Sequence, residues 1–100
     1  MTSRIAPRGP LPDSAEPYRT IGPFDAASLP AGLRARHSLK PGAWGLIRLA
    51  EGRLSFVWED DQGGVDEIVA PAEFVVPPEA PHHVEADGPF ELTITFHRAA

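Results

Sequence analysis

The sequence predicts a single all-β domain, an antiparallel sandwich or barrel, and three observations support this prediction. The chain has 100 residues, which is enough for one hydrophobic core and too few for two. Twelve residues are proline, about twice the usual share, and proline strongly destabilises a helix interior. Several short stretches alternate apolar and polar residues, as half-buried strands do, and turn residues separate these stretches.

The N-terminal segment differs in composition from the rest of the chain. Residues 1–17 contain four prolines and little periodic hydrophobicity. Segments of this kind bury too little apolar surface to offset the entropy of ordering the chain. We therefore expect a disordered leader over residues 1–17 and a folded domain over residues 18–98.

The alternating pattern begins at Leu33. Within residues 33–39, His37 falls on the same face as Leu33 and Leu39, the apolar face of the expected strand. The stretch from Asp25 to Leu29 is the one helix candidate, and it is too short to be stable alone. The elements expected up to residue 70 are strands over 33–39, 44–50, 53–59 and 65–70, turns at Pro41-Gly42 and Glu51-Gly52, and a hairpin loop over 60–64.

Further short strands are expected after residue 70. Residues 74–76 form an apolar run that a Pro-Pro pair terminates, since proline cannot donate to a strand ladder. Residues 82–86 follow, and the stretch from Phe90 to His97 alternates more regularly than any other. This succession of short strands and turns is typical of antiparallel sandwiches and barrels.

The charge of the chain is asymmetric. Residues 1–50 carry seven basic and three acidic side chains, a balance of +4, whereas residues 51–100 carry two basic and eleven acidic ones, a balance of −9. No basic stripe is interleaved with aromatic residues, so a nucleic-acid partner is not expected. No apolar run approaches the roughly 20 residues of a membrane span, and the N-terminus lacks the apolar core of a secretory signal. We expect no membrane partner and, by default, a cytoplasmic location.

The four histidines are the main candidates for binding chemistry, because the chain has no cysteine. Strand phase places His37 and His82 on inward faces and His83 and His97 on outward faces. Two inward imidazoles on different strands could meet in a cavity and bind a divalent metal ion such as zinc, nickel or iron. The alternative is two buried histidines whose ring nitrogens bond to carbonyl or carboxylate oxygens.

A metal site would need a third ligand. Glu73 and Glu85 are available, although phase puts Glu85 on the face opposite to His82. His97 would serve only if the last strand inverted its phase near the end. Trp44 follows a Pro-Gly turn and is expected at the mouth of the cavity, where its ring could contact a small ligand together with Glu85.

Three segments occur in a characteristic order: R-H-S-L-K-P-G-A-W-G at residues 36–45, L-A-E-G-R-L-S-F at 49–56 and V-V-P-P-E-A-P-H-H-V-E-A at 75–86. Together they resemble the cupin-type domain at the N-terminus of some tellurite-resistance TehB proteins, which also occurs as stand-alone YeaR-like proteins. The resemblance covers most of the chain outside the leader and implies a small jelly-roll β-barrel of the RmlC-like cupin class over residues 18–98. It also implies a stand-alone version without the methyltransferase that follows the domain in TehB proteins.

The resemblance also bears on the histidines. His37 and His82 fall on the recurrent histidine positions of the family, whereas Gly45 stands near the place where wider metal cupins carry a glutamate. These features predict a small cupin binding module, related to tellurite resistance and stress, that holds a metal ion or small ligand in the barrel. Two alternatives remain: a small cupin enzyme, such as a metal-dependent isomerase or oxygenase acting on a polar substrate, and a homodimeric interaction module without catalysis.

Overall fold

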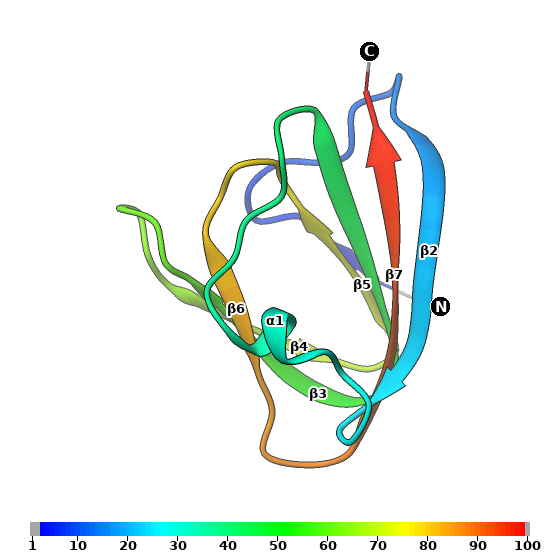
Figure 1. Ribbon diagram of the computed structural model, residues 1–100, viewed down its shortest axis with the longest axis vertical. Helices are drawn as coiled ribbons and strands as arrows, with labels where there is room; N and C mark the ends of the chain where they lie inside the picture. Colours follow the sequence, from blue (N-terminus) through cyan, green and yellow to red (C-terminus); the bar gives the residue numbers. More distant parts are fainter. Residues whose placement is uncertain (1–2, 100) are drawn as a thin grey trace.

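The computed structural model describes residues 3–99, and these residues are mostly β-strand (Figure 1). The all-β class is therefore confirmed, and the helical content is a single turn. The elements are β1 (Ser3–Ile5), β2 (Glu16–Asp25), α1 (Ala31–Arg34), β3 (Ala43–Trp58), β4 (Val65–Val69), β5 (Ala72–Val76), β6 (His82–Glu85) and β7 (Phe90–Arg98).

The long strand β3 organises the molecule because each of its halves pairs with different neighbours. The first half lies between β5 and β7 in the order β1-β5-β3-β7-β2. The second half pairs with β4 and β6. A register shift between Leu49 and Glu51 marks the place where β3 passes from one set of neighbours to the other. One continuous sheet thus folds over on itself into two facing halves (Figure 1).

This arrangement corrects three expectations. Residues 44–50 and 53–59 belong to one strand rather than two, because Gly52 stays paired with Phe90 in the ladder instead of turning the chain. The prediction of a strand over 33–39 is wrong, since α1 extends to Arg34 and the residues after it form only a single bridge at His37. The predicted jelly-roll barrel is not a closed barrel among the described residues: β1 and β2 form the two ends of the strand order and do not pair with each other.

The two halves of the sheet enclose an aromatic core. Phe56 and Phe74 are fully buried, and their ring centroids lie 4.6 Å apart. The ring of Trp58 packs edge-on against Phe56 at 4.7 Å. Along β3 and β7, side chains that point into the core alternate with side chains that point outward. The apolar residues that the sequence places on one face of these strands are therefore the residues that the core buries.

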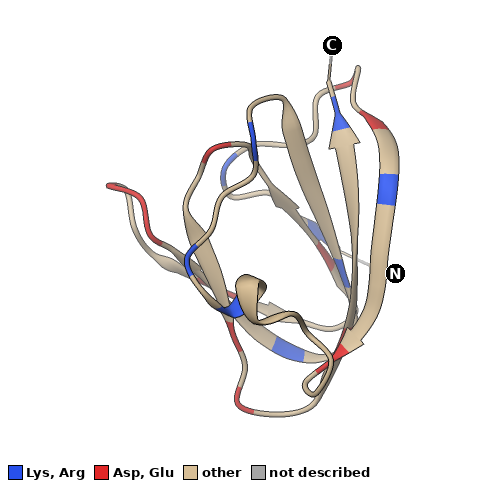
Figure 2. Cartoon of the chain, in the orientation of Figure 1, with Lys and Arg blue, Asp and Glu red and all other residues tan. Residues whose placement is uncertain are grey.

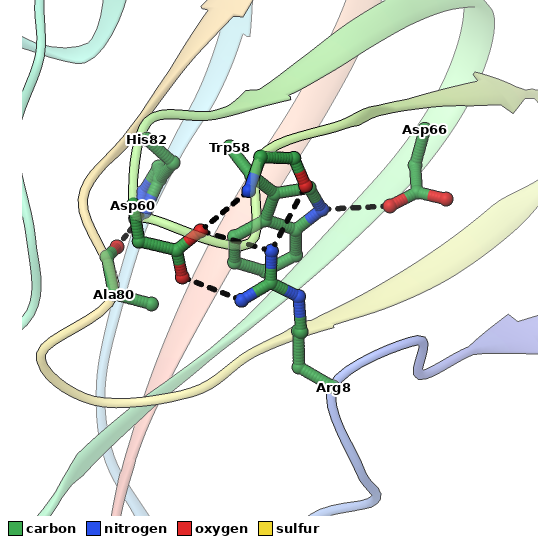
Figure 3. Close-up of polar contacts among 7 residues, drawn as sticks. Arg8, Trp58, Asp60, Asp66, Ala80 and His82 are labelled. Atoms are coloured by element: carbon green, nitrogen blue, oxygen red, sulfur yellow. Dashed lines mark hydrogen bonds and ion pairs between the residues drawn. The ribbon is translucent and has the colours of Figure 1, made fainter.

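The N-terminal segment, which composition predicts to be a disordered leader, is described from Ser3 onward and contacts the rest of the domain; residues 1–2 lie outside the described part. Strand β1 pairs in parallel with the edge of β5. The Arg8 guanidinium donates to Asp60 Oδ2 at 2.6 Å and to Asp60 Oδ1 at 3.2 Å, and it stacks 4.1 Å above the Trp58 ring (Figure 3). These contacts join residues more than fifty positions apart in the sequence, so composition does not reveal them.

The Arg8–Asp60 contact predicts a specific pH dependence of stability. The hydrogen bond from Arg8 holds the pKa of Asp60 at about 2, below its ordinary value. A carboxyl with a lowered folded-state pKa stabilises the fold above its unfolded pKa and loses that contribution as pH falls through its folded pKa. We expect the urea midpoint to fall between about pH 4 and pH 2, and this part of the decrease to be smaller in Arg8→Met. Asp61→Asn, a change in the same loop, is the control; an equal decrease in Arg8→Met would contradict the prediction.

No helix of the described residues is both long enough and apolar enough to cross a membrane.

The acidic residues of the second half of the chain lie in part at the tip of the β3–β4 hairpin and in the loop after β6 (Figure 2).

Candidate functional site

A pocket lies between the two halves of the sheet, and residues of the segment over 26–42, which contains α1, contribute to its lining. Figure 1 shows this segment and α1 in front of the sheet. The free volume of the pocket is about 50 Å³. The segment over 26–42 takes part because Leu29 is buried in the core, and because the amide of Glu79 donates to the Leu39 carbonyl at 2.8 Å. The lining residues are Leu29, Leu33, His37, Leu39, Gly45, Ile47, Phe56, Val76, His82, Val84, Leu92, Ile94 and Phe96.

The two histidines predicted to point inward meet in this pocket. Their backbones form an isolated antiparallel bridge, in which the His37 amide donates to the His82 carbonyl at 2.9 Å and the His82 amide donates back at 2.8 Å. Their ring centroids lie 4.2 Å apart with planes inclined by 67°. The prediction that His37 and His82 converge rests on strand phase, yet His37 reaches the pocket from a bridge within a loop.

Each imidazole is held by a backbone carbonyl two residues earlier. Nδ1 of His37 lies 2.9 Å from the Ala35 carbonyl oxygen, and Nδ1 of His82 lies 2.7 Å from that of Ala80 (Figure 3 shows the latter). A carbonyl oxygen can only accept, so Nδ1 carries the proton in both rings. In a neutral ring this leaves the lone pair on Nε2, which is the arrangement found in metal-bound histidines.

His82 is the more buried of the two histidines, and its burial changes the pKa of its ring. Its ring is stacked on Phe56 with centroids 4.6 Å apart, and only 3% of the residue is exposed. Burial lowers the pKa of His82 to about 4, and the neighbouring His37 adds to this effect. His82 is therefore neutral at neutral pH. Its Nε2 atom has no hydrogen bond within the described residues. Every fully buried side-chain nitrogen or oxygen atom of these residues has a hydrogen-bond partner, so the unpaired Nε2 atom is not fully buried and is accessible.

The donor set only partly fits a divalent metal ion. The described residues contain no group of three or more histidine, cysteine or carboxylate side chains placed to hold one. Glu73, considered as a third ligand, is on the outer face of the sheet, where Arg4 and Arg48 both bond to its carboxylate. His97 is paired opposite Trp44 and does not line the pocket. Two imidazoles alone fall short of the three or four protein ligands of typical zinc sites.

The two residues predicted to contact a ligand, Trp44 and Glu85, do not line the pocket that contains His37 and His82. Trp44 neighbours the pocket residue Gly45 in β3, so its side chain is on the opposite face of the strand, and it is half-buried there. Glu85 is exposed and accepts from Nε2 of His83. Glu85 instead borders a polar surface recess with Arg53, Ser55, Glu67 and Asp87.

The sequence argument missed two contributors to the pocket. Gly45 is a buried glycine inside β3, and a Cβ there would lie 3.3 Å from the Leu39 side chain, so its small size keeps the pocket open. An isolated glycine in a strand often marks such a close approach, which is the signal that could have revealed it. The covering role of residues 26–42 has no comparable local signal, because it depends on where that segment folds.

The fold and the site together define a small β-domain with an internal apolar pocket that contains two histidines. The chain matches the TehB-like domain over residues 19–94 and belongs to that family. The family assignment predicted from the three sequence segments is thus confirmed as far as TehB-like. A comparison with curated protein sequences gives no match.

Solved structures of two proteins have a similar fold. TehB from Haemophilus influenzae is 24% identical with a TM-score of 0.78, over 87% of this chain and 32% of that one. A protein from E. coli strain K12, whose structure came from a structural genomics consortium, is 25% identical with a TM-score of 0.79, over 91% of this chain and 97% of that one. The present chain therefore spans about a third of the length of that TehB protein and nearly the whole length of the E. coli protein.

Proposed function

We propose that this domain is a small cupin-type binding module that holds a small ligand in the pocket at His37 and His82. The observation that carries the proposal is the paired arrangement of the two rings. Both Nδ1 atoms are tied to backbone carbonyls, so both rings are held in position, and both rings line the same pocket. Side chains held in this way are preorganised for binding, since little rotamer freedom is lost when a ligand arrives.

The setting that we propose is a tellurite-related stress response. This part of the proposal depends on membership of the TehB-like domain family and on the similarity to a TehB structure. The ligand itself is argued from the pocket alone.

A divalent metal ion is the second candidate ligand, and the accessible Nε2 atom of His82 favours it. Zinc, nickel or iron would bind Nε2 of His37 and His82 and would need further ligands from solvent or from a bound molecule. Such a centre could supply Lewis-acid chemistry, which keeps a small metal-dependent enzyme as the alternative activity.

The test is binding to the dialysed protein. We would record NMR spectra of the 15N-labelled protein during titration with zinc, nickel and iron(II), and use native mass spectrometry to detect molecules that co-purify without chelators. We expect a metal ion or a co-purified molecule to shift the His37 and His82 signals of the wild type. His97→Ala, which changes a histidine on the outer face, should bind as the wild type does, whereas His37→Ala/His82→Ala should not. Absence of any bound species, or equal binding by the double variant, would refute the proposal.

A further inference from the structure

The lining of the pocket restricts the chemistry of its ligand. Apart from the two histidines, every lining residue is apolar or glycine, and no charged side chain of the described residues lines the pocket. The nearby basic residues of the covering segment are directed elsewhere: Arg34, Arg36 and Lys40 are all exposed, and Arg34 donates to the Ala26 carbonyl at 2.6 Å. An anion entering the pocket would therefore lose its hydration without gaining an arginine or lysine partner.

The polar atom that His82 offers to the pocket is a hydrogen-bond acceptor. Since the Ala80 carbonyl fixes the proton of the neutral His82 ring on Nδ1, its accessible Nε2 atom presents a lone pair. Nδ1 of His37 has the same kind of partner. A carboxylate or another oxyanion brings only lone pairs of its own to this atom, whereas an O–H or N–H group would donate a hydrogen bond to it.

We infer that the pocket binds a neutral small molecule with an apolar body and one O–H or N–H group, which donates to Nε2 of His82. This inference rests on the proposed function and names the class of ligand. It sets aside an oxyanion because no arginine or lysine of the described residues lines the pocket, and a divalent metal ion because these residues provide no third protein ligand.

The size of the pocket sets the size of the buried part of the ligand. A free volume of about 50 Å³ holds the equivalent of only a few water molecules. The donor group and a few adjoining atoms would be enclosed by the lining residues, which include His82 and Gly45, and the rest of a larger molecule would extend out of the pocket.

Three probes with the same aromatic body test this inference: phenol has an O–H donor, anisole replaces the donor with a methyl ether, and benzoate carries a negative charge. The 15N-labelled protein would be titrated with each probe, and the signals of Gly45, Val84 and the His82 ring would be followed. We expect phenol to bind roughly five- to tenfold more tightly than anisole, the value of one hydrogen bond. We expect benzoate to leave the pocket signals unchanged.

Two variants and one control locate the effect. His82→Phe keeps an aromatic ring on Phe56 but removes Nε2, so it should bind phenol and anisole equally. Gly45→Ala keeps both histidines and places a methyl group in the pocket, so it should weaken phenol binding several-fold. Gly88→Ala is the matched control, because a Cβ there has no neighbour within 4 Å, and it should bind as the wild type does. Gly45→Ala also serves as the test should His82→Phe fail to fold.

The outcomes separate this inference from the proposed function. Equal binding of phenol and anisole, binding of benzoate at the pocket, or no shift with phenol would overturn the neutral-donor inference. If a metal ion or a co-purified molecule still bound in a histidine-dependent way, the proposed function would stand without it. If the double histidine variant also bound that species, both would fail.

Discussion

Gly52→Ala is expected to destabilise the domain by at least about 3 kcal/mol, the largest effect of any glycine substitution in the chain. Gly52 has a φ of +83°, in the left-handed region that side chains disfavour. A Cβ there would lie 2.2 Å from the Pro89 carbonyl oxygen and 2.8 Å from the Phe90 Cα atom. Both are backbone atoms where the chain enters β7, which begins at Phe90, so they cannot move aside as a flexible side chain could. Relief of the clash would require β3 and β7 to separate.

Gly42→Ala is the matched control for this prediction. Gly42 has a φ of +79°, nearly the same conformation, but a Cβ there would have no neighbour within 4 Å. Gly42→Ala should therefore lower the free energy of unfolding only by the cost of placing a side chain in the left-handed region, about 1–2 kcal/mol. Urea unfolding followed by circular dichroism would measure both free energies. If the two variants were equally stable, the close approach of β3 to β7 at Gly52 would not be part of the native fold.

Phe56→Ala is expected to lower the free energy of unfolding by about 3–5 kcal/mol. Phe56 is completely buried, and its ring contacts the rings of Trp58, Phe74 and His82 with centroids 4.6–4.7 Å away. Truncation would leave a cavity beside the pocket and remove the surface on which the His82 ring is stacked. We therefore also expect the ring signals of His82 to broaden or shift in the NMR spectrum of this variant.

Val65→Ala is the control for the core substitution. Val65 lies in β4 and is 56% exposed, so its truncation should change stability by less than about 0.5 kcal/mol. Phe56→Leu retains more of the core volume and should fall between the two. A Phe56→Ala variant as stable as Val65→Ala would show that the aromatic cluster does not form the centre of the core.

Local pattern accounts for the parts of the fold that were predicted correctly. β5, β6 and β7 were expected within two residues of their observed ends, because their apolar and polar residues alternate or because turn residues bound them. The inward placement of His82 follows from the same alternation, since Val84 and His82 share a face of β6 and both are buried.

The errors lie where the local pattern is compatible with more than one path of the chain. The residues Glu51-Gly52 resemble a turn, and only the partner strand β7 shows that β3 continues through them. Residues 33–39 alternate like a strand, but their backbone has a single bridging partner at His82, so no ladder forms. Segments of this kind are decided by hydrogen-bond partners that the local sequence does not contain.

Local sequence is enough to predict the all-β class, the strands after residue 64, the inward face of His82 and the family. Alternation, turn chemistry and short motifs are local properties of the chain, so they can be read without knowledge of the fold. The tertiary structure alone decided that β3 is continuous, that the N-terminal segment is held by β5 and Asp60, and that residues 26–42 help to enclose the pocket. It also decided the tautomers of His37 and His82, because these depend on which carbonyl each ring meets. These features arise from contacts between residues distant in sequence or from the exact path of a loop, and neither is encoded in periodicity.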